Sequence, residues 1–218
     1  LAAVSLLCGP AFTAPALPDR ADIRDSGFVY CVSGQVNTFN PQKVSSGLIV
    51  DTLAAQIYDR LLDVDPYTYR LVPELAESWE VLDNGATYRF HLRRHVPFQR
   101  TAWFTPTRDF NADDVIFTFG RIFNRDHPWH NVNGSSFPYF DSLQFADSVR
   151  KLDNQTVEFR LKRPDASFLW HLATHYASIT SAEYAARLTQ DDRQEQLDRQ
   201  PVGTGPFKLS DYRSGQYV

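Results

Sequence analysis

The feature that most constrains the fold is a β-hairpin signal at residues 79–92. The turn-forming sequence Asp83-Asn84-Gly85 separates Trp79–Leu82 from Thr87–Leu92. In the second segment Tyr88, Phe90 and Leu92 alternate with Arg89, His91 and Arg93. Alternation beside an Asn-Gly pair is typical of two antiparallel strands joined by a tight turn. We expect the apolar side chains of this hairpin to face a core.

A helix and a second hairpin follow. Asn111 is expected to cap the helix, with Asp113 and Asp114 in the first turn, where carboxylates suit the helix dipole. The second hairpin is predicted at Val149–Leu161, and its exit strand, TVEFRL, resembles TYRFHL of the first hairpin. The pattern predicts an α/β subdomain over residues 59–165. The predicted core residues are Trp79, Tyr88, Phe90 and Phe119.

Further elements are predicted outside this subdomain. Phe28–Val32 is apolar on both faces, as in a buried strand. Ser45-Ser46-Gly47 is expected to open a helix whose apolar residues recur every four positions. Two short helices are predicted near Ser167–Tyr176 and Ser181–Leu188, and Gly205–Leu209 resembles a strand.

The charge balance bears on possible partners. A formal net charge of -4 and a pI near 5.8 argue against a nucleic-acid partner, since phosphate binding needs a basic face. Thr189–Gln200, with the sequence TQDDRQEQLDRQ, is expected to be a solvated surface segment.

The first residues predict export. Leu1–Ala14 is apolar, rich in small residues and uncharged, and it is too short to span a bilayer. It is typical of a secretory signal peptide that lacks its basic start. Residues 1–16 are therefore interpreted as a signal-peptide remnant with cleavage after Ala16, and a buried N-terminal helix is the alternative.

Cys31 is then the single cysteine of the mature segment. An odd cysteine in an exported chain indicates a free thiol or a partner elsewhere. Because residues 205–218 read as a strand, a turn and the start of a returning strand, the sequence is interpreted as a piece of a longer protein. We expect a disulfide between Cys31 and a cysteine beyond Val218, with a free thiol in a strand core as the alternative.

Several longer stretches carry a family resemblance. They are LAESWEVLDNGATYRFHL at Leu75–Leu92, NADDVIFTF at Asn111–Phe119, GTGPF at Gly203–Phe207 and YCVSGQVNTFNPQ at Tyr30–Gln42. In order and spacing they are similar to the dipeptide- and oligopeptide-binding proteins, extracellular solute-binding protein family 5, which feed ABC importers. Residues 22–40 and 127–147 most resemble the branch associated with antimicrobial-peptide transport.

Two segments depart from the pattern of this family. Residues 99–110, QRTAWFTPTRDF, form a longer loop than the short turn of many members, as in the dipeptide-binding branch. The segment between Phe140 and Lys151 is a few residues shorter than in this family.

The resemblance implies an α/β fold: a two-lobed, type II periplasmic binding protein with a ligand cleft between the lobes. This chain would be the N-terminal part of lobe I. Residues 17–58 would begin the lobe I core, residues 59–165 would be the inserted subdomain, and residues 166–218 would return to the core before lobe II.

The implied function is peptide capture in the periplasm of a Gram-negative bacterium, after cleavage of the signal peptide. The peptide would be held by main-chain hydrogen bonds and buried by lobe closure. The closed form would then be read by membrane permease subunits. We expect a monomer, not an enzyme, with no cofactor, metal site or nucleic-acid partner.

The best candidates for ligand contact are Ser45, Ser46 and Gly47. They lie between the first predicted strand and helix, where backbone N–H groups and hydroxyls point outward at a helix N-terminus. The alternative is plain helix capping by Ser46. Trp129 and His130 are the second candidate, in a polar loop that could line the cleft, although Trp129 could equally fill the subdomain core.

Two other motifs suggest different chemistry. His171 and His175 are four residues apart on a predicted helix, which suits a metal or haem site, but Leu172 stands where the zincin pattern has Glu. A core-packing helix is the favoured reading. Gly203-Thr204-Gly205 is followed by Pro206 where a phosphate loop has Lys, so a backbone turn is favoured there.

Two rival functions stay open. Within the family the rival ligand is haem or a metal complex, for which the six histidines are a weak hint. From another class the rival is a secreted hydrolase, although the sequence has no G-x-S-x-G motif to present a nucleophilic serine.

Overall fold

The computed structural model describes residues 36–43, 54–134, 137–141 and 146–214. The signal segment, the predicted strand at 28–32, Cys31 and Ser45-Ser46-Gly47 lie outside the described residues. The α-helices are α3 (Ala55–Ile57), α4 (Ala112–Phe123), α5 (Pro138–Asp141), α6 (Phe168–Leu172) and α7 (Ala182–Gln190). The strands are β1 (Leu62–Val64), β2 (Leu71–Pro73), β3 (Ala76–Leu82), β4 (Thr87–Leu92), β5 (Ala146–Asp153) and β6 (Thr156–Leu161). The short 3-10 helices are η1 (Pro41–Lys43), η3 (Asp83–Gly85), η4 (Val132–Gly134), η5 (His175–Ala177) and η6 (Gln194–Asp198).

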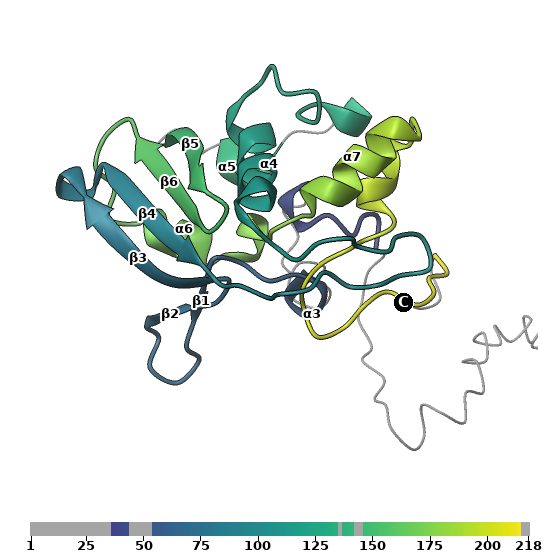
Figure 1. The fold of residues 1–218 in the computed structure, drawn as a ribbon, viewed down its shortest axis with the longest axis horizontal. Coiled ribbons are helices and arrows are strands. Elements are labelled where there is room, and N and C mark those ends of the chain that lie inside the picture. Colours follow the sequence, from purple (N-terminus) through teal and green to yellow (C-terminus); the bar gives the residue numbers. More distant parts are fainter. Residues whose placement is uncertain (1–35, 44–53, 135–136, 142–145, 215–218) are drawn as a thin grey trace, which may run out of the picture.

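Both predicted hairpins are confirmed, and they form one antiparallel sheet with the strand order β3-β4-β6-β5 (Figure 1). The exit strands β4 and β6 pair in the centre, where Phe90 lies opposite Val157 and Tyr88 lies opposite Phe159. Each of these strands pairs on both edges and buries one face. That shared environment accounts for the similar sequences TYRFHL and TVEFRL.

The backbone of the first hairpin's turn explains why Asp, Asn and Gly stand there. Asp83, Asn84 and Gly85 all have positive φ, at 50°, 53° and 89°. This left-handed region is open to Gly and is tolerated by Asn and Asp better than by other residues. The turn is closed by a hydrogen bond from Thr87 Oγ1 to Asp83 Oδ2 at 2.7 Å.

The cap of α4 is also confirmed. The Asn111 side chain accepts a hydrogen bond from the N–H of Asp113 at 2.8 Å, and the Asp114 carboxylate accepts one from the N–H of Asn111 at 2.9 Å. This reciprocal arrangement is a capping box. Figure 1 shows α4 between the four-stranded sheet and α7.

Aromatic rings fill the space between α4 and the sheet. The Phe119 ring of α4 lies 5.0 Å from that of Phe159, which lies 5.6 Å from that of Phe90. Tyr88, Phe90 and Phe119 are buried, as predicted. Trp79 is only partly buried because β3 is the edge strand of the sheet.

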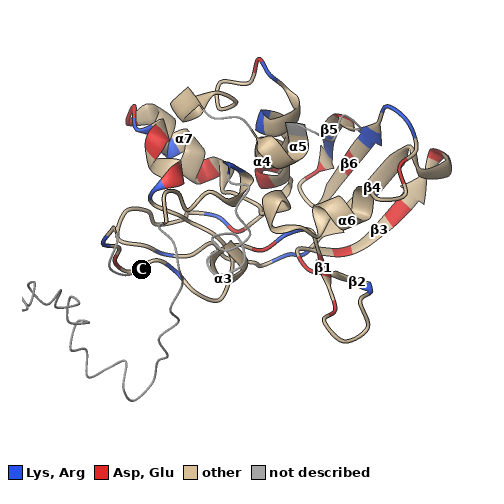
Figure 2. Ribbon diagram, turned by 180° about the vertical axis from the view of Figure 1, so that it is seen from behind, with Lys and Arg blue, Asp and Glu red and all other residues tan. Residues whose placement is uncertain are grey.

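The opposite face of the sheet carries a row of alternating charges. Across the strands run Glu80, Arg89, Glu158 and Arg150, with N–O distances of 3.5, 2.9 and 2.5 Å between neighbours. Figure 2 shows both signs of charge across these strands. The two arginines leave the Glu158 side chain only 7% exposed. In the part of the chain that the structure describes, ion pairs thus cover this face of the sheet.

Glu158→Gln is expected to lower the free energy of unfolding by about 1–3 kcal/mol, because charge-assisted hydrogen bonds from two arginines are lost. Glu80→Gln is the matched control, since the Glu80 side chain is 46% exposed and exposed pairs contribute roughly 0–1 kcal/mol. Urea denaturation of the intact protein measures both. Equal losses for the two variants would contradict the central role of Glu158.

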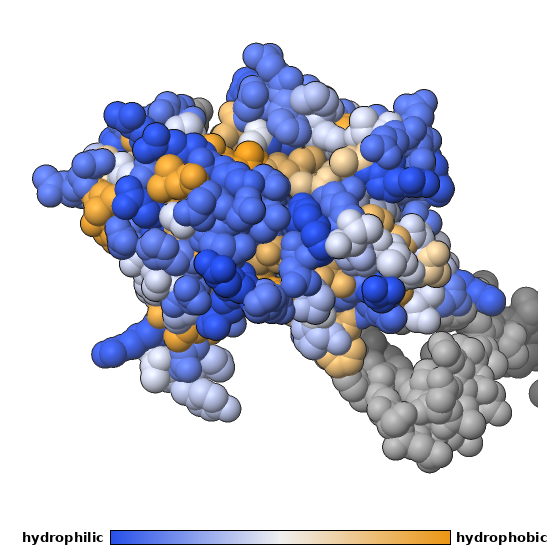
Figure 3. All heavy atoms as spheres, viewed as in Figure 1, coloured by the Kyte–Doolittle hydropathy of each residue, from blue (hydrophilic) through white to orange (hydrophobic). Residues whose placement is uncertain are grey.

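Large exposed apolar side chains are scattered over several elements. They are Tyr67, Tyr69, Val81, Leu152, Trp170 and Phe207. The face shown in Figure 3 is mostly hydrophilic, with apolar groups set among charged ones. Within the described ranges no helix is long and apolar enough to cross a membrane.

Candidate functional site

The first predicted ligand segment is bracketed by described residues. Ser45, Ser46 and Gly47 themselves lie outside the described residues, so their contact with ligand stays a prediction. The described chain stops at Lys43 and resumes at Ala54. The contacts of the described residues on these two sides show how Lys43 and α3 are held in the fold.

On the N-terminal side the chain is fixed by the carboxylate of Asp198 in η6. This carboxylate accepts hydrogen bonds from Asn40 Nδ2 at 2.8 Å, from Lys43 Nζ at 3.1 Å and from Asn133 Nδ2 at 3.0 Å. Lys43 Nζ also donates to the carbonyl oxygen of Val132 at 2.7 Å. We call these five residues the Asp198 hub.

The ion pair at the centre of the hub is buried. The side chains of Lys43 and Asp198 are 4% and 13% exposed. Burial lowers the pKa of the Lys43 ammonium, and the Asp198 carboxylate opposes that shift. Removing one partner of a buried ion pair leaves the other charge uncompensated, so each residue of the pair depends on the other.

A second buried cation lies beside the hub. Arg121 of α4 is fully buried, and its guanidinium lies 5.5 and 5.4 Å from the ring centroids of Phe117 and Phe137. It donates to the side-chain oxygen of Gln42, the residue before Lys43. Burial lowers the pKa of Arg121 to about 10, with Asp198 opposing the shift, so the side chain stays charged at neutral pH.

Trp129 and His130 are both buried, at 6% and 7% exposure. The Trp129 ring packs edge-on against Phe117, and His130 Nδ1 lies 2.7 Å from the carbonyl oxygen of Arg121. Their side chains therefore contact the protein's own core, which favours the core-filling alternative for Trp129. Their contact with ligand stays a prediction.

The structure brings together described residues that flank the two predicted ligand segments in the sequence. Gln42 and Lys43 lie shortly before the first segment, and Val132 and Asn133 lie shortly after the second. All four are tied to Asp198, Arg121 or each other. The expectation that residues 189–200 form a solvated segment is wrong for η6, because Leu197 and Asp198 are buried at 5% and 9% exposure.

On the C-terminal side the GTGPF motif packs against α3. The N–H groups of Gly205 and Phe207 donate to the carbonyl oxygens of Ile57 and Gln56 at 3.0 and 2.9 Å. The predicted strand at Gly205–Leu209 is wrong, because these N–H groups are taken by a helical segment rather than by a neighbouring strand. A Cβ added at Gly203 would lie 1.9 Å from Ile57 O, so glycine is required for this approach.

The side chain of Gln99 stabilises the contact between the GTGPF motif and α3. Its side-chain amide donates to the carbonyl oxygens of Ile57 at 3.1 Å and Gly205 at 2.9 Å, and its side-chain oxygen accepts from the N–H of Gly203 at 3.2 Å. One carboxamide thus joins α3 to the GTGPF motif. The motif acts here as a backbone anchor and not as a phosphate loop, in line with the turn favoured from the sequence.

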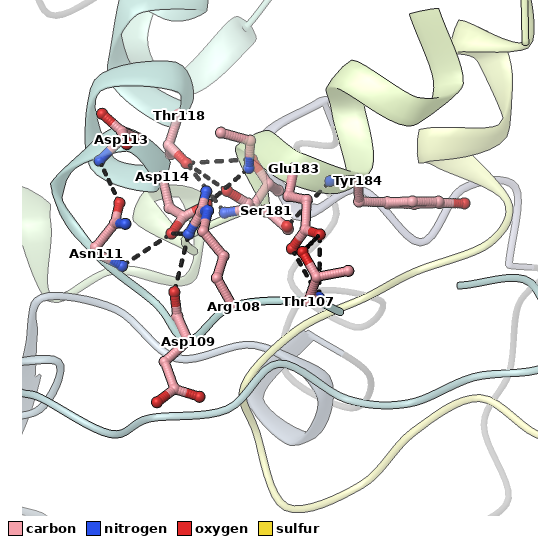
Figure 4. Close-up of polar contacts among 12 residues, drawn as sticks. Thr107, Arg108, Asp109, Asn111, Asp113, Asp114, Thr118, Ser181, Glu183 and Tyr184 are labelled. Carbon is pink, nitrogen blue, oxygen red and sulfur yellow. Dashed lines mark hydrogen bonds and ion pairs between the residues drawn. The ribbon is translucent and has the colours of Figure 1, made fainter. Parts of the chain in front are cut away.

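The N-termini of α4 and α7 are joined by the polar contacts shown in Figure 4. Asp114 is fully buried and accepts two hydrogen bonds from Arg108, at 2.7 and 2.8 Å, and one from the N–H of Ala182 at 2.8 Å. Glu183 accepts from Thr107 Oγ1 at 2.6 Å. These hydrogen bonds fix α7 relative to α4, and with α7 they fix η6 and Asp198.

A serine, a histidine and an aspartate meet at the start of α6. Ser167 Oγ donates to Asp165 Oδ1 at 2.6 Å and lies 3.0 Å from His171 Nε2, and His171 Nδ1 lies 2.9 Å from the Tyr139 hydroxyl. Because the serine proton goes to Asp165, Ser167 Oγ accepts from His171. A general base needs the opposite direction, in which histidine accepts the serine proton. This arrangement does not support the hydrolase hypothesis.

His171 and His175 do not share one helix. α6 ends at Leu172, and His175 lies in η5. His175 Nδ1 accepts a hydrogen bond from Arg60 at 3.0 Å, because guanidinium has only donors. Among the described residues no cluster of three or more His, Cys, Asp or Glu side chains could hold a metal ion.

Comparison with known proteins identifies the family. Residues 70–218 match the model of "Bacterial extracellular solute-binding proteins, family 5 Middle". The chain is 79% identical over its whole length to "Probable ABC transporter periplasmic-binding protein SapA" of Escherichia coli and covers 40% of that protein. It is 83% identical to "Peptide transport periplasmic protein SapA" of Salmonella typhimurium, over 95% of this chain and 38% of that one.

A solved structure confirms the fold class. The dipeptide-binding protein of a Pseudoalteromonas species, in complex with Met-Leu, superimposes with a TM-score of 0.82 at 41% identity, over 85% of this chain and 37% of that one. The predicted α/β fold of a type II periplasmic binding protein is therefore confirmed. This chain spans about 40% of the length of the relatives it matches. It belongs to family 5 of the bacterial extracellular solute-binding proteins.

Proposed function

We propose that this protein captures peptides, antimicrobial peptides among them, in the periplasm of a Gram-negative bacterium and delivers them to the permease subunits of an ABC importer. The observation that carries the proposal is the identity of 79% and 83% with two relatives named as periplasmic proteins of an ABC transporter and of peptide transport. The Met-Leu complex of a structural relative supports a peptide as ligand.

In this proposal the chain supplies the first part of lobe I, and the peptide lies in the cleft between two lobes. Residues 17–58 and 166–218 belong to the core of the lobe, and residues 59–165 form the inserted subdomain. Ser45, Ser46 and Gly47 contact the peptide, with Trp129 and His130 as further candidates. The protein is a monomer and not an enzyme. Its signal peptide is removed after Ala16, and Cys31 forms a disulfide with a cysteine that follows Val218 in the longer protein.

The described contacts suit such a role. A binding site must be held in a fixed geometry by groups that do not touch the ligand. Here the Asp198 hub fixes the chain before residue 44, and Gln99 with the GTGPF motif fixes it after residue 54.

Haem is the second candidate ligand. The chain is 43% identical, over 88% of its length, to "Heme-binding protein A" of Haemophilus influenzae, and it covers 36% of that protein. A protein similar enough to share this fold can still bind a different ligand, because the function depends on the residues of the site.

Calorimetric titration of the intact protein separates these ligands. We expect heat of binding with peptides and none with haem or Ni²⁺. Binding of haem alone would replace the peptide proposal with the haem alternative. Turnover of a generic peptide or ester substrate, abolished by changing one serine or carboxylate, would instead support a hydrolase.

Residues 17–218 alone are expected not to bind peptide with useful affinity. Ligand sites bury about 70–90% of the ligand surface, and one part of one lobe supplies a single wall. Titration of the same peptide against residues 17–218 and against the intact protein measures the difference. Similar affinity in both would place the whole site within this segment and contradict the two-lobe mechanism.

A further inference from the structure

A groove of about 510 Å³ lies between α4 and β5, the edge strand of the four-stranded sheet. On the α4 side its lining is an apolar stripe formed by Ile116, Phe117, Gly120 and Phe123. On the opposite side are residues 147–149 of β5. The groove has the size of a small-ligand site, since such sites typically occupy roughly 300–1,000 Å³.

β5 offers backbone groups to a further strand. It pairs with β6 on one side, and among the described residues no strand pairs with its other side. An open edge of this kind can take up an extended peptide by main-chain hydrogen bonds. Val149 lies opposite Phe159, whose ring contacts Phe119 of α4. Every second side chain of an added strand would therefore face α4, as Val149 does.

Gly120 lets another chain approach α4 closely. Glycine in a helix interior is less stable than alanine. Crowding within the described residues does not explain its presence, because the atom nearest to an added Cβ is Cδ2 of His127, at 4.0 Å. The helix thus lacks a side chain on the stripe that lines the groove.

His127 supplies a hydrogen-bond donor beside Gly120. Its Nδ1 accepts from the N–H of Trp129 at 3.1 Å, so Nε2 carries the proton of the neutral ring. Burial, together with Arg121 and His130, lowers the pKa of His127 and keeps the ring neutral near pH 7. Nε2 is bonded to the same Cδ2 that lies nearest to Gly120, and its N–H suits a peptide carbonyl.

The charged side chains that line the groove are both acidic, Asp113 and Asp147. Asp113 pairs with Lys151 at 2.8 Å. Within the described ranges the exposed carboxylate of Asp147 has no ion-pair or hydrogen-bond partner. A carboxylate beside an apolar groove is complementary to a lysine or arginine of a bound segment.

We propose that this groove is a second peptide site, which takes an extended cationic segment with alternating apolar side chains as a strand on β5. The apolar side chains of the segment contact the stripe of α4, and a lysine or arginine lies beside Asp147. This inference goes beyond the proposed function, because the site consists of described residues and does not involve the cleft between the lobes.

Photo-cross-linking of the intact protein locates the site. The probe is the peptide Val-Lys-Val-Lys-Phe with blocked termini and a benzophenone on its Phe ring, and cross-linked residues are mapped by mass spectrometry. We expect cross-links in α4, in residues 124–127 and in β5. Cross-links found only beyond Val218 would overturn this inference and leave the proposed function standing. Failure to capture natural peptides, with cross-links in the groove, would do the reverse.

Two variants test the chemistry of the groove. Gly120→Leu places a side chain in it and is expected to abolish these cross-links without lowering the Tm, since leucine is favoured over glycine in a helix. Asp147→Asn is expected to lower the yield about threefold, as for an exposed ion pair, but not with a probe in which norleucine replaces lysine. Asp192→Asn, at an exposed position outside the groove, is the control with unchanged yield.

Wild-type yield in folded Gly120→Leu would overturn the inference. So would an Asp147→Asn protein that cross-links both probes as the wild type does. Because Asp147 is exposed and makes no contact that the fold needs, this variant decides the question on its own if Gly120→Leu does not fold.

Discussion

Phe90→Ala is expected to lower the free energy of unfolding by about 3–5 kcal/mol, the usual cost of truncating a core phenylalanine. Phe90 is fully buried in β4, a central strand, and its ring packs edge-on against Phe159. Phe159 in turn contacts Phe119 of α4, so the cavity would open at the contact between the sheet and the helix. Chemical denaturation of the intact protein measures the loss.

Phe207→Ala is the control for this change. It removes the same atoms from a side chain that is 55% exposed, and surface changes of this kind usually stay within about 0.5 kcal/mol. If Phe90→Ala kept wild-type stability and lost only affinity for ligand, then Phe90 would be a binding residue and its assignment to the core would be wrong.

Gly203→Ala is expected to lower the free energy of unfolding by about 3 kcal/mol, at the upper end of the range for adding atoms to a well-packed site. The added methyl would lie 1.9 Å from the carbonyl oxygen of Ile57 and 2.8 Å from its carbonyl carbon. These are backbone atoms, which cannot swing aside as a side chain can. The GTGPF motif would have to separate from α3, and the hydrogen bonds of Gln99 that join the two would weaken.

Gly120→Ala is the matched control, with the same added methyl and the opposite sign. Gly120 lies within α4, and the nearest atom to an added Cβ is a ring carbon of His127 at 4.0 Å. Alanine in a helix interior is favoured over glycine by about 0.5–1 kcal/mol. Thermal unfolding of both variants should show one loss and one gain. A neutral Gly203→Ala would show that the close approach to α3 does not constrain position 203.

Elements with a local signal could be predicted from the sequence. The two hairpins, the Asn111 cap and the helix at 182–190 each depend on turn, capping or periodic residues that lie close together in the chain. Tyr88 and Phe90 face the core because strand alternation fixes their side. Trp79 shares that side, but its partial exposure depends on β3 being an edge strand, which the pattern of the hairpin does not specify.

Contacts between distant segments could not be predicted in this way. Asp198 lies in a polar run of the sequence that carries no local signal for burial. Its burial depends on Asn40 and Lys43, which lie more than 150 residues earlier. Gln99 likewise had no local signal, because its partners are backbone groups of Ile57 and Gly205. The predicted strand at 205–209 failed for the same reason, since its hydrogen-bond partner is α3.

A native mass spectrum of the intact protein, isolated from periplasm without added ligand, shows directly whether the protein binds peptides. A peptide-binding protein that closes around its ligand is expected to retain peptides during purification. We expect a set of bound species whose extra masses are those of peptides and which fragment into amino-acid residues. A single bound species with the mass of haem would contradict peptide capture.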